Sequence, residues 1–252
     1  QAMLNQGCVN AMNLDGGGSV GVMDPSGKVL IGYTSRQVCC ALVFRRLVDE
    51  HPAVVPQPPQ PQPKGGEKMI VCIDPGHGGP DPGAVSPSGI REKEITLTVA
   101  KRVAEYLRRA DVQVVLTRDT DKELVLGNDD AAELRARAKV ANDAKADFFL
   151  SIHCNAASTS DAEGFEVYHY PGSTKGAMLA TKIADAYALA SGLKRRKVAS
   201  ANFQVLRDTA MPAALIELGF LTNKADCALL REPAFLDKIA LGIAFGILEM
   251  RA

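Results

Sequence analysis

Short apolar runs alternate with amphipathic segments along most of the chain. Runs typical of buried strands cover 68–73, 112–116, 147–152, 164–168, 203–206 and 213–216. Helical spacing of apolar positions, or an Ala-rich composition, predicts helices over 94–110, 131–146, 176–190 and 233–250. Strands that alternate with helices predict an α/β fold. We expect a twisted, mostly parallel sheet of about six strands with helices on both faces.

A proline-rich segment separates this pattern from the first part of the chain. Six of the twelve residues at 52–63 are proline, and Lys-Gly-Gly follows at 64–66. Proline fixes φ and removes a backbone donor, which favours an extended, semi-rigid linker over an irregular loop within one domain. We therefore expect a β-rich segment over 1–50, a linker over 51–67 and one domain of ordinary size over 68–252.

The charge balance narrows the class of partner. The 252 residues carry 29 Lys and Arg side chains against 29 Asp and Glu, whereas nucleic-acid-binding proteins usually show a basic excess. No apolar run reaches the roughly 18 residues of a transmembrane helix. We expect neither a nucleic-acid partner nor a membrane span. None of the six cysteines forms a Cys-x-x-Cys pair, and Cys72 and Cys154, in or beside apolar runs, are expected to be buried free thiols.

Side chains capable of metal chemistry stand beside the predicted strands. His77, His153 and Glu217 each follow a strand closely, and Glu92 stands at the start of the first predicted helix. Ligands of open α/β sheets bind beyond the carboxyl ends of the strands. Two neutral imidazoles and one carboxylate are a common ligand set for catalytic zinc, which activates water. A second carboxylate nearby can move the proton.

Each of these residues also has a structural interpretation. A histidine after a strand is commonly a hydrogen-bonded structural residue, and Glu92 could be a solvated acid favoured by the helix dipole. Glu217 is harder to explain in this way, because an acid at the end of an apolar strand is costly unless it is paired or functional. His169 could be a further metal contact or a surface residue of a strand edge. The basic run 194–197 could contact an acidic polymer or form a solvated loop.

Several sequence blocks occur together in order. They are IDPGHGG at 73–79, REKE at 91–94, SIHCNA at 151–156 and NFQVLRDTAMPAALIELGFLTN at 202–223. With these blocks, residues 68–252 resemble the zinc-dependent N-acetylmuramoyl-L-alanine amidases of the amidase-3 family, which are cell-wall hydrolases.

The resemblance implies a specific set of roles. His77, Glu92 and His153 match the three ligands of one Zn²⁺, and Glu217 matches the catalytic glutamate. The reaction would be hydrolysis of the amide that joins the lactyl group of N-acetylmuramic acid to L-alanine of the peptidoglycan stem peptide. Asn155 matches a position that helps to hold the site. Arg118 also matches, as a substrate contact or as a structural residue. The alternatives are a zinc peptidase acting on stem peptides and a non-catalytic peptidoglycan-binding module.

Two further expectations come from the same comparison. Cys154 stands where family members often carry asparagine, a change that leaves the ligand beside it intact. Some family members insert a long segment with a helix that blocks the zinc, whereas only 154–163 separates His153 from Gly164. We therefore expect an enzyme that acts on peptidoglycan without an activator protein. We also expect a monomer. Its expected location is extracellular, at the cell wall, with the export signal outside this sequence.

The amino-terminal segment has a second resemblance. Its glycine-rich run NLDGGGS at 13–19 is followed by a strand, a turn and a strand, and this order is similar to the carboxyl-terminal end of the phosphodiester glycosidase family. Asp15 would be the candidate site residue there. So short a segment buries too little surface to be stable alone. We expect part of a longer two-enzyme protein, with no glycosidase activity in this segment.

Overall fold

The computed structural model describes residues 11–14, 19–23, 29–34, 68–127 and 129–251. The chain divides into two compact units, residues 1–64 and 65–252, which are described separately. No helix among the described residues has both the length and the apolar character needed to cross a membrane.

The amino-terminal unit contains a small antiparallel sheet. Its strands are β1 (Ala11–Leu14), β2 (Ser19–Met23) and β3 (Val29–Thr34), in the order β1-β2-β3. A register shift interrupts the β2–β3 pairing between Val22 and Met23. These strands agree with the expected β-rich segment. Asp15 and the proline-rich linker lie outside the described residues.

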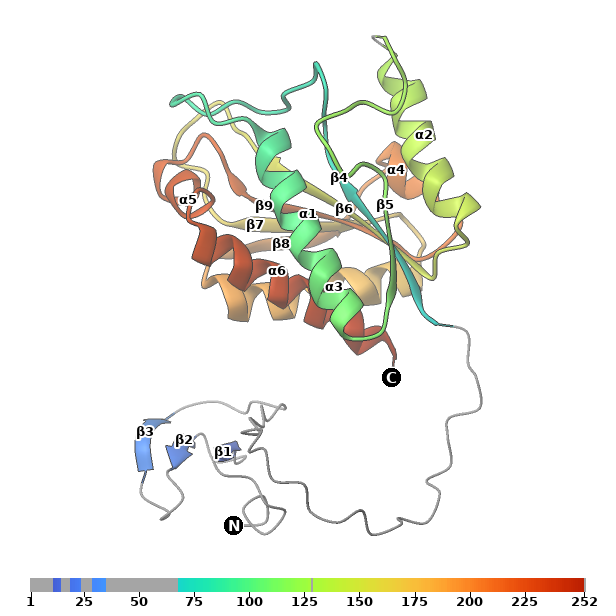
Figure 1. The fold of residues 1–252 in the computed structure, drawn as a ribbon. Coiled ribbons are helices and arrows are strands. Elements are labelled where there is room, and N and C mark those ends of the chain that lie inside the picture. Colours follow the sequence, from blue (N-terminus) through green and yellow to red (C-terminus); the bar gives the residue numbers. More distant parts are fainter. Residues whose placement is uncertain (1–10, 15–18, 24–28, 35–67, 128, 252) are drawn as a thin grey trace, which may run out of the picture. The chain divides into compact units, whose positions relative to one another are not determined.

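The carboxyl-terminal unit is built on one six-stranded sheet (Figure 1). Its order is β5-β4-β6-β9-β7-β8, and all neighbouring strands are parallel except β7 and β9. The strands are β4 (Ile70–Pro75), β5 (Gln113–Leu116), β6 (Phe148–Asn155), β7 (Phe165–His169), β8 (Arg195–Ser200) and β9 (Ala213–Phe220). The predicted α/β fold with a mostly parallel sheet is confirmed.

Helices cover both faces of this sheet (Figure 1). The helices are α1 (Glu92–Arg109), α2 (Asp130–Asp143), α3 (Thr174–Ser191), α4 (Gln204–Arg207), α5 (Lys224–Leu229) and α6 (Pro233–Leu248), with a 3₁₀ turn over Glu249–Arg251. Helices α1, α3 and α6 bury the larger apolar core against one face, and α2 and α4 a smaller core against the other. Cys72 and Cys154 are buried free thiols, as predicted.

Two local predictions are wrong. The apolar run 203–206 was expected to be a strand, but residues 204–207 form helix α4, which buries Val205 and Leu206. A run this short has no decisive periodicity, so burial against the sheet determines its form. The basic run 194–197 was interpreted as a contact for an acidic polymer or as a solvated loop, and the loop is wrong, because the run enters β8 at the sheet edge. Charged side chains are common on edge strands because they prevent edge-to-edge pairing.

Candidate metal and catalytic site

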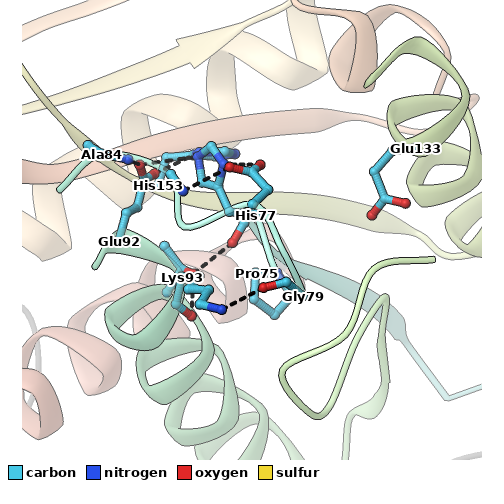
Figure 2. Close-up of polar contacts among 12 residues, drawn as sticks. Pro75, His77, Gly79, Ala84, Glu92, Lys93, Glu133 and His153 are labelled. Carbon is cyan, nitrogen blue, oxygen red and sulfur yellow. Dashed lines mark hydrogen bonds and ion pairs between the residues drawn. The ribbon is translucent and has the colours of Figure 1, made fainter. Parts of the chain in front are cut away.

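The sheet topology brings the predicted site residues to one edge. Strands β4, β6 and β9 are parallel neighbours, so their carboxyl ends lie together. His77 follows β4, His153 lies near the end of β6, and Glu217 is the register partner of His153 on β9. Glu92 is the first residue of α1. Figure 2 shows the side chains of His77, Glu92 and His153 converging.

The three side chains form a compact cluster of donor atoms. His77 Nε2 lies 3.1 Å from Glu92 Oε2, and His153 Nδ1 lies 3.0 Å from Glu92 Oε1. One ligand atom from each residue lies within 4.8 Å of the other two. Two imidazole nitrogens and one carboxylate oxygen at this spacing are a donor set suited to zinc. The cluster therefore fits the metal that the sequence predicts.

Glu92 is held by backbone groups as well as by the histidines. Its two carboxylate oxygens accept the N–H groups of Ala84 and Cys154, each at 2.8 Å. Burial alone would raise the pKa of Glu92, but its contacts with His153 and His77 outweigh burial and hold that pKa well below its usual range. The carboxylate is therefore charged and fixed in direction, as a metal ligand must be.

His77 adopts a backbone conformation that is unusual for a residue with a side chain. Its φ is +62°, in the left-handed region. Its Nδ1 lies 2.6 Å from Asp81 Oδ2, while Nε2 faces Glu92. Burial lowers the pKa of His77, but the hydrogen bonds and charges of Glu92 and Asp81 outweigh it and raise the pKa to about 9. The two carboxylates that stabilise a charged imidazole also favour a cation at this site.

Two buried arginines hold the loop that carries His77. Arg137 donates to the carbonyl oxygens of Pro75 and His77, at 2.7 and 2.8 Å. Arg118 donates to the carbonyl oxygens of Pro75 and Gly76, at 3.0 and 2.9 Å. Arg118 is only 1% exposed. The sequence left two roles open for Arg118, and these contacts favour a structural role over a substrate contact.

Arg137 is itself fixed by a buried carboxylate. Arg137 pairs with Asp74 Oδ1 at 2.9 Å, and Asp74 also accepts the hydroxyl groups of Thr117 and Ser151, at 2.6 and 2.7 Å. Burial raises the pKa of Asp74, but the charge of Arg137 and the two hydroxyl groups outweigh it and lower the pKa. This network ties β4, β6 and α2 together beneath the site.

Gly76 allows the loop to approach His153 closely. A Cβ atom at Gly76 would lie 2.3 Å from His153 Cε1, a distance that a real side chain cannot occupy. The His153 ring therefore packs directly on the Gly76 backbone. This contact gives a physical reason for glycine immediately before His77 in the sequence.

Glu217 differs from the other acids of the site. Its Oε2 is buried and has no hydrogen-bond partner among the described residues. Burial raises the pKa of Glu217 to about 7, despite the nearby charge of His153. An unsatisfied buried oxygen carries a substantial free-energy cost. A residue of this kind, with a pKa near neutrality, is suited to accept and release a proton.

The remaining candidates lie around this centre. Asn155 Nδ2 donates to Glu166 Oε2 at 3.0 Å, so it fixes a neighbouring carboxylate. His169 is paired in register with Ala214, at the far end of β7 from Glu217, and lies outside the donor cluster. A cavity of about 380 Å³ opens over His77 and His153. Its other lining residues are Asp74, Gly76, Asp81, Asp130, Glu133, Leu134 and Arg137.

Three residues of the site were not singled out from the sequence. Asp81 is four residues from His77, but a loop of unknown conformation gives no signal that the two meet. Arg137 lies within an Ala- and Arg-rich helix whose several basic residues look alike in sequence. Glu166 stands in a predicted strand, and its burial beside Glu217 depends on the register of β7 and β9.

Comparison with known proteins adds a family assignment to this geometry. The family model described as N-acetylmuramoyl-L-alanine amidase matches residues 71–249. The germination-specific N-acetylmuramoyl-L-alanine amidase of Bacillus subtilis (strain 168) is 35% identical over 187 residues, which cover 71% of this chain and 78% of that protein. The endolysin of Bacillus phage SPP1 is 40% identical over 188 residues, which cover 72% of this chain and 65% of that protein.

A solved structure shows the same architecture. N-acetylmuramoyl-L-alanine amidase AmiC2 of Nostoc punctiforme is 36% identical to this chain and superposes with a TM-score of 0.68. The match covers 74% of this chain and 99% of the AmiC2 chain.

Proposed function

The chain belongs to the N-acetylmuramoyl-L-alanine amidases, and we propose on that premise that it is a zinc-dependent peptidoglycan hydrolase. Its substrate bond is the amide between the lactyl group of N-acetylmuramic acid and L-alanine of the stem peptide. The observation that carries the proposal is the His77–Glu92–His153 cluster beside Glu217, a buried acid with an unpartnered oxygen. We assign the activity to residues 68–252, with the proline-rich segment as a linker.

His77, Glu92 and His153 are the residues that would hold the zinc. When bound, zinc supplies a Lewis acid that lowers the pKa of water and polarises a carbonyl oxygen. Asp81 fixes the ring of His77 from its other nitrogen, at 2.6 Å. A carboxylate in that position sets the tautomer and the orientation of a liganding histidine.

Glu217 moves the proton in this mechanism. Its carboxylate takes a proton from the attacking water and delivers it to the leaving amine of L-alanine. Two features support this role. Glu217 is the register partner of His153, so the base and a ligand lie side by side. Its pKa of about 7 allows it both to accept and to release a proton near neutral pH.

The framework beneath the site keeps these residues in position. Arg118 and Arg137 donate to three consecutive carbonyl groups, those of Pro75, Gly76 and His77. A left-handed residue such as His77 persists only where its surroundings hold it. The two arginines therefore maintain the loop in the conformation that aims His77 at Glu92.

The site is proposed to act without an activator protein. Residues 156–163, which join β6 to β7, contain no helix that could cover the cluster. The proposed location is the cell wall, outside the cell, where peptidoglycan is accessible. If the purified chain were inert on peptidoglycan until a second protein was added, an open site would be excluded.

Mass analysis of the products released from peptidoglycan tests the proposed bond. Free stem peptides that begin at L-alanine, released together with intact glycan, are the expected products. Cleavage only within the peptide would identify a zinc peptidase. Binding without any released product would identify a wall-binding module.

A further inference from the structure

A row of charged residues extends from the site toward β8, the edge strand of the sheet. Glu217 on β9 is the register partner of Glu166 on β7, and Glu166 is the register partner of Lys197 on β8. Partner residues of neighbouring strands point to the same face of a sheet. The side chains of His153, Glu217, Glu166 and Lys197 therefore share one face, in the strand order β6-β9-β7-β8.

A bulge brings a second cation to this row. The β7–β8 register shifts between Phe165 and Glu166, so that Arg196 and Lys197 both face Glu166. Arg196 Nε donates to Glu166 Oε1 at 2.8 Å, and Lys197 Nζ lies 3.7 Å from Glu166 Oε2. The side chains of Arg196 and Lys197 are 37% and 48% exposed, whereas Glu166 is buried. One face of each cation is thus open to solvent.

Glu166 carries a single negative charge, so it cannot neutralise both cations. Its Oε2 already accepts hydrogen bonds from Asn155 and Tyr168, at 3.0 and 2.6 Å. Glu166, Arg196 and Lys197 together therefore carry one net positive charge, which lies beside Glu217 in the row. Aromatic rings fix the two cations, because the Arg196 guanidinium lies 5.0 Å from the Phe220 ring and Lys197 Nζ 5.1 Å from the Tyr168 ring.

The opposite side of the site has the opposite charge. The cavity over His77 and His153 is lined by Asp81, Asp130 and Glu133, of which Glu133 pairs with Arg137. A substrate with a neutral sugar at one end and carboxylates at the other is oriented by such an asymmetry. Its anionic end is repelled by the β4 side and attracted by the β8 side.

We infer that Arg196 and Lys197 bind a carboxylate of the acidic stem peptide on the leaving-group side of the scissile amide. Strand β8 lies two strand spacings from β9, about 10 Å, which equals the length of about three extended residues. The cations are therefore within reach of the peptide just beyond the cleaved bond. This inference rests on the proposed amidase activity and assigns its peptide subsite.

Kinetics on two synthetic muramoyl peptides test the subsite. The peptides are identical except that the stem carboxylates are free in one and amidated in the other.

Arg196→Gln and Lys197→Gln are compared in the full chain with the matched control Arg195→Gln. Arg195 is the next residue on β8, but it pairs with Asp185 of α3 at 2.6 Å. We expect Arg196→Gln to raise KM about tenfold on the free-carboxylate peptide, because the variant loses a charge-assisted hydrogen bond to the stem carboxylate. KM on the amidated peptide, and both values for Arg195→Gln, should stay unchanged.

The outcomes separate the inference from the proposed function. If the wild-type chain cleaves neither peptide, the amidase proposal fails. If the wild-type chain cleaves both peptides, the subsite is tested by Arg196→Gln and Lys197→Gln. Should these two variants change KM equally on the two peptides, or change it on neither peptide, the subsite is refuted while the amidase proposal stands. Thermal melting checks the fold of each variant. Lys197→Gln leaves Glu166 paired with Arg196, so it remains informative if Arg196→Gln unfolds.

Discussion

His153 and Glu217 are register partners on the parallel strands β6 and β9. This pairing places the imidazole of one and the carboxylate of the other on the same face of the sheet, at its carboxyl edge. Strand β6 thus supplies a proposed metal ligand, His153, and the neighbouring strand β9 supplies the proposed base, Glu217. The two functions are separated by a single strand spacing, about 5 Å. Glu217 could therefore act on a water molecule at the proposed metal site without being a ligand itself.

Glu217→Gln should remove turnover but leave zinc binding intact. Loss of a general base typically lowers kcat by about 10²–10⁴-fold, and the amide keeps the shape of the side chain. The zinc content of the purified variant should equal that of the wild type. Glu94→Gln, an exposed acid on α1, is the matched control and should keep full activity. Loss of zinc together with activity in Glu217→Gln would show that Glu217 is a ligand.

Asp81→Asn should weaken zinc binding without removing a ligand. The contact of Asp81 with His77 Nδ1 fixes the ring, and mutation of such a partner typically lowers metal affinity or activity by about 10–100-fold. Competition with a chromogenic chelator measures the affinity directly. Asp119→Asn, which changes an exposed acid away from the cluster, is the control. Equal affinities in Asp81→Asn and the wild type would contradict the orienting role.

Arg137→Met should destabilise the fold far more than Lys139→Met on the same helix. Arg137 pairs with buried Asp74, and breaking a buried pair by removing one partner costs about 3–5 kcal/mol. Lys139 pairs with Asp143 at the surface, where both side chains are more than 60% exposed, and such pairs contribute at most about 1 kcal/mol. Denaturant unfolding of both variants gives the comparison. Similar losses would show that the network beneath His77 is not structurally important.

The contribution of Asp74 to stability should depend on pH. Its pKa lies below the ordinary value of 3.8, so its ionised form stabilises the folded state above that pH. This stability is lost as the pH falls through the depressed pKa. The difference in unfolding free energy between wild type and Asp74→Asn should therefore be largest near neutral pH and shrink below about pH 4. A difference that stays constant with pH would indicate that Asp74 acts only through its shape.

The sequence was sufficient to predict the core of the fold and the proximity of His77, Glu92, His153 and Glu217. Apolar runs marked β4, β6 and β9, and the rule that parallel strands share a carboxyl edge placed His77, His153 and Glu217 together. The sheet is mixed at β7, which runs antiparallel to β9. Strand direction at that point depends on tertiary packing, which a local pattern does not contain.

Other parts of the site depend on long-range contacts. Arg137 reaches the carbonyl of Pro75 across 62 positions, and Arg118 reaches it across 43. Arg118 was singled out only by the family resemblance, and Arg137 does not differ in local pattern from the other arginines of its helix. The relation of Arg196 and Lys197 to Glu166 depends on a bulge and on a strand that the sequence did not predict. Such relations become visible only when the register of the sheet is known.

Zinc removal and restoration, followed on defined muramoyl peptide, tests the central claim most directly. Chelation should abolish release of peptides that begin at L-alanine, and stoichiometric zinc should restore it. The melting temperature should also fall on chelation, because a ligand that binds only the folded state stabilises it. His153→Ala should bind no zinc and stay inactive. Full activity and unchanged melting temperature in the chelated protein would contradict the assignment of His77, Glu92 and His153 as a catalytic metal site.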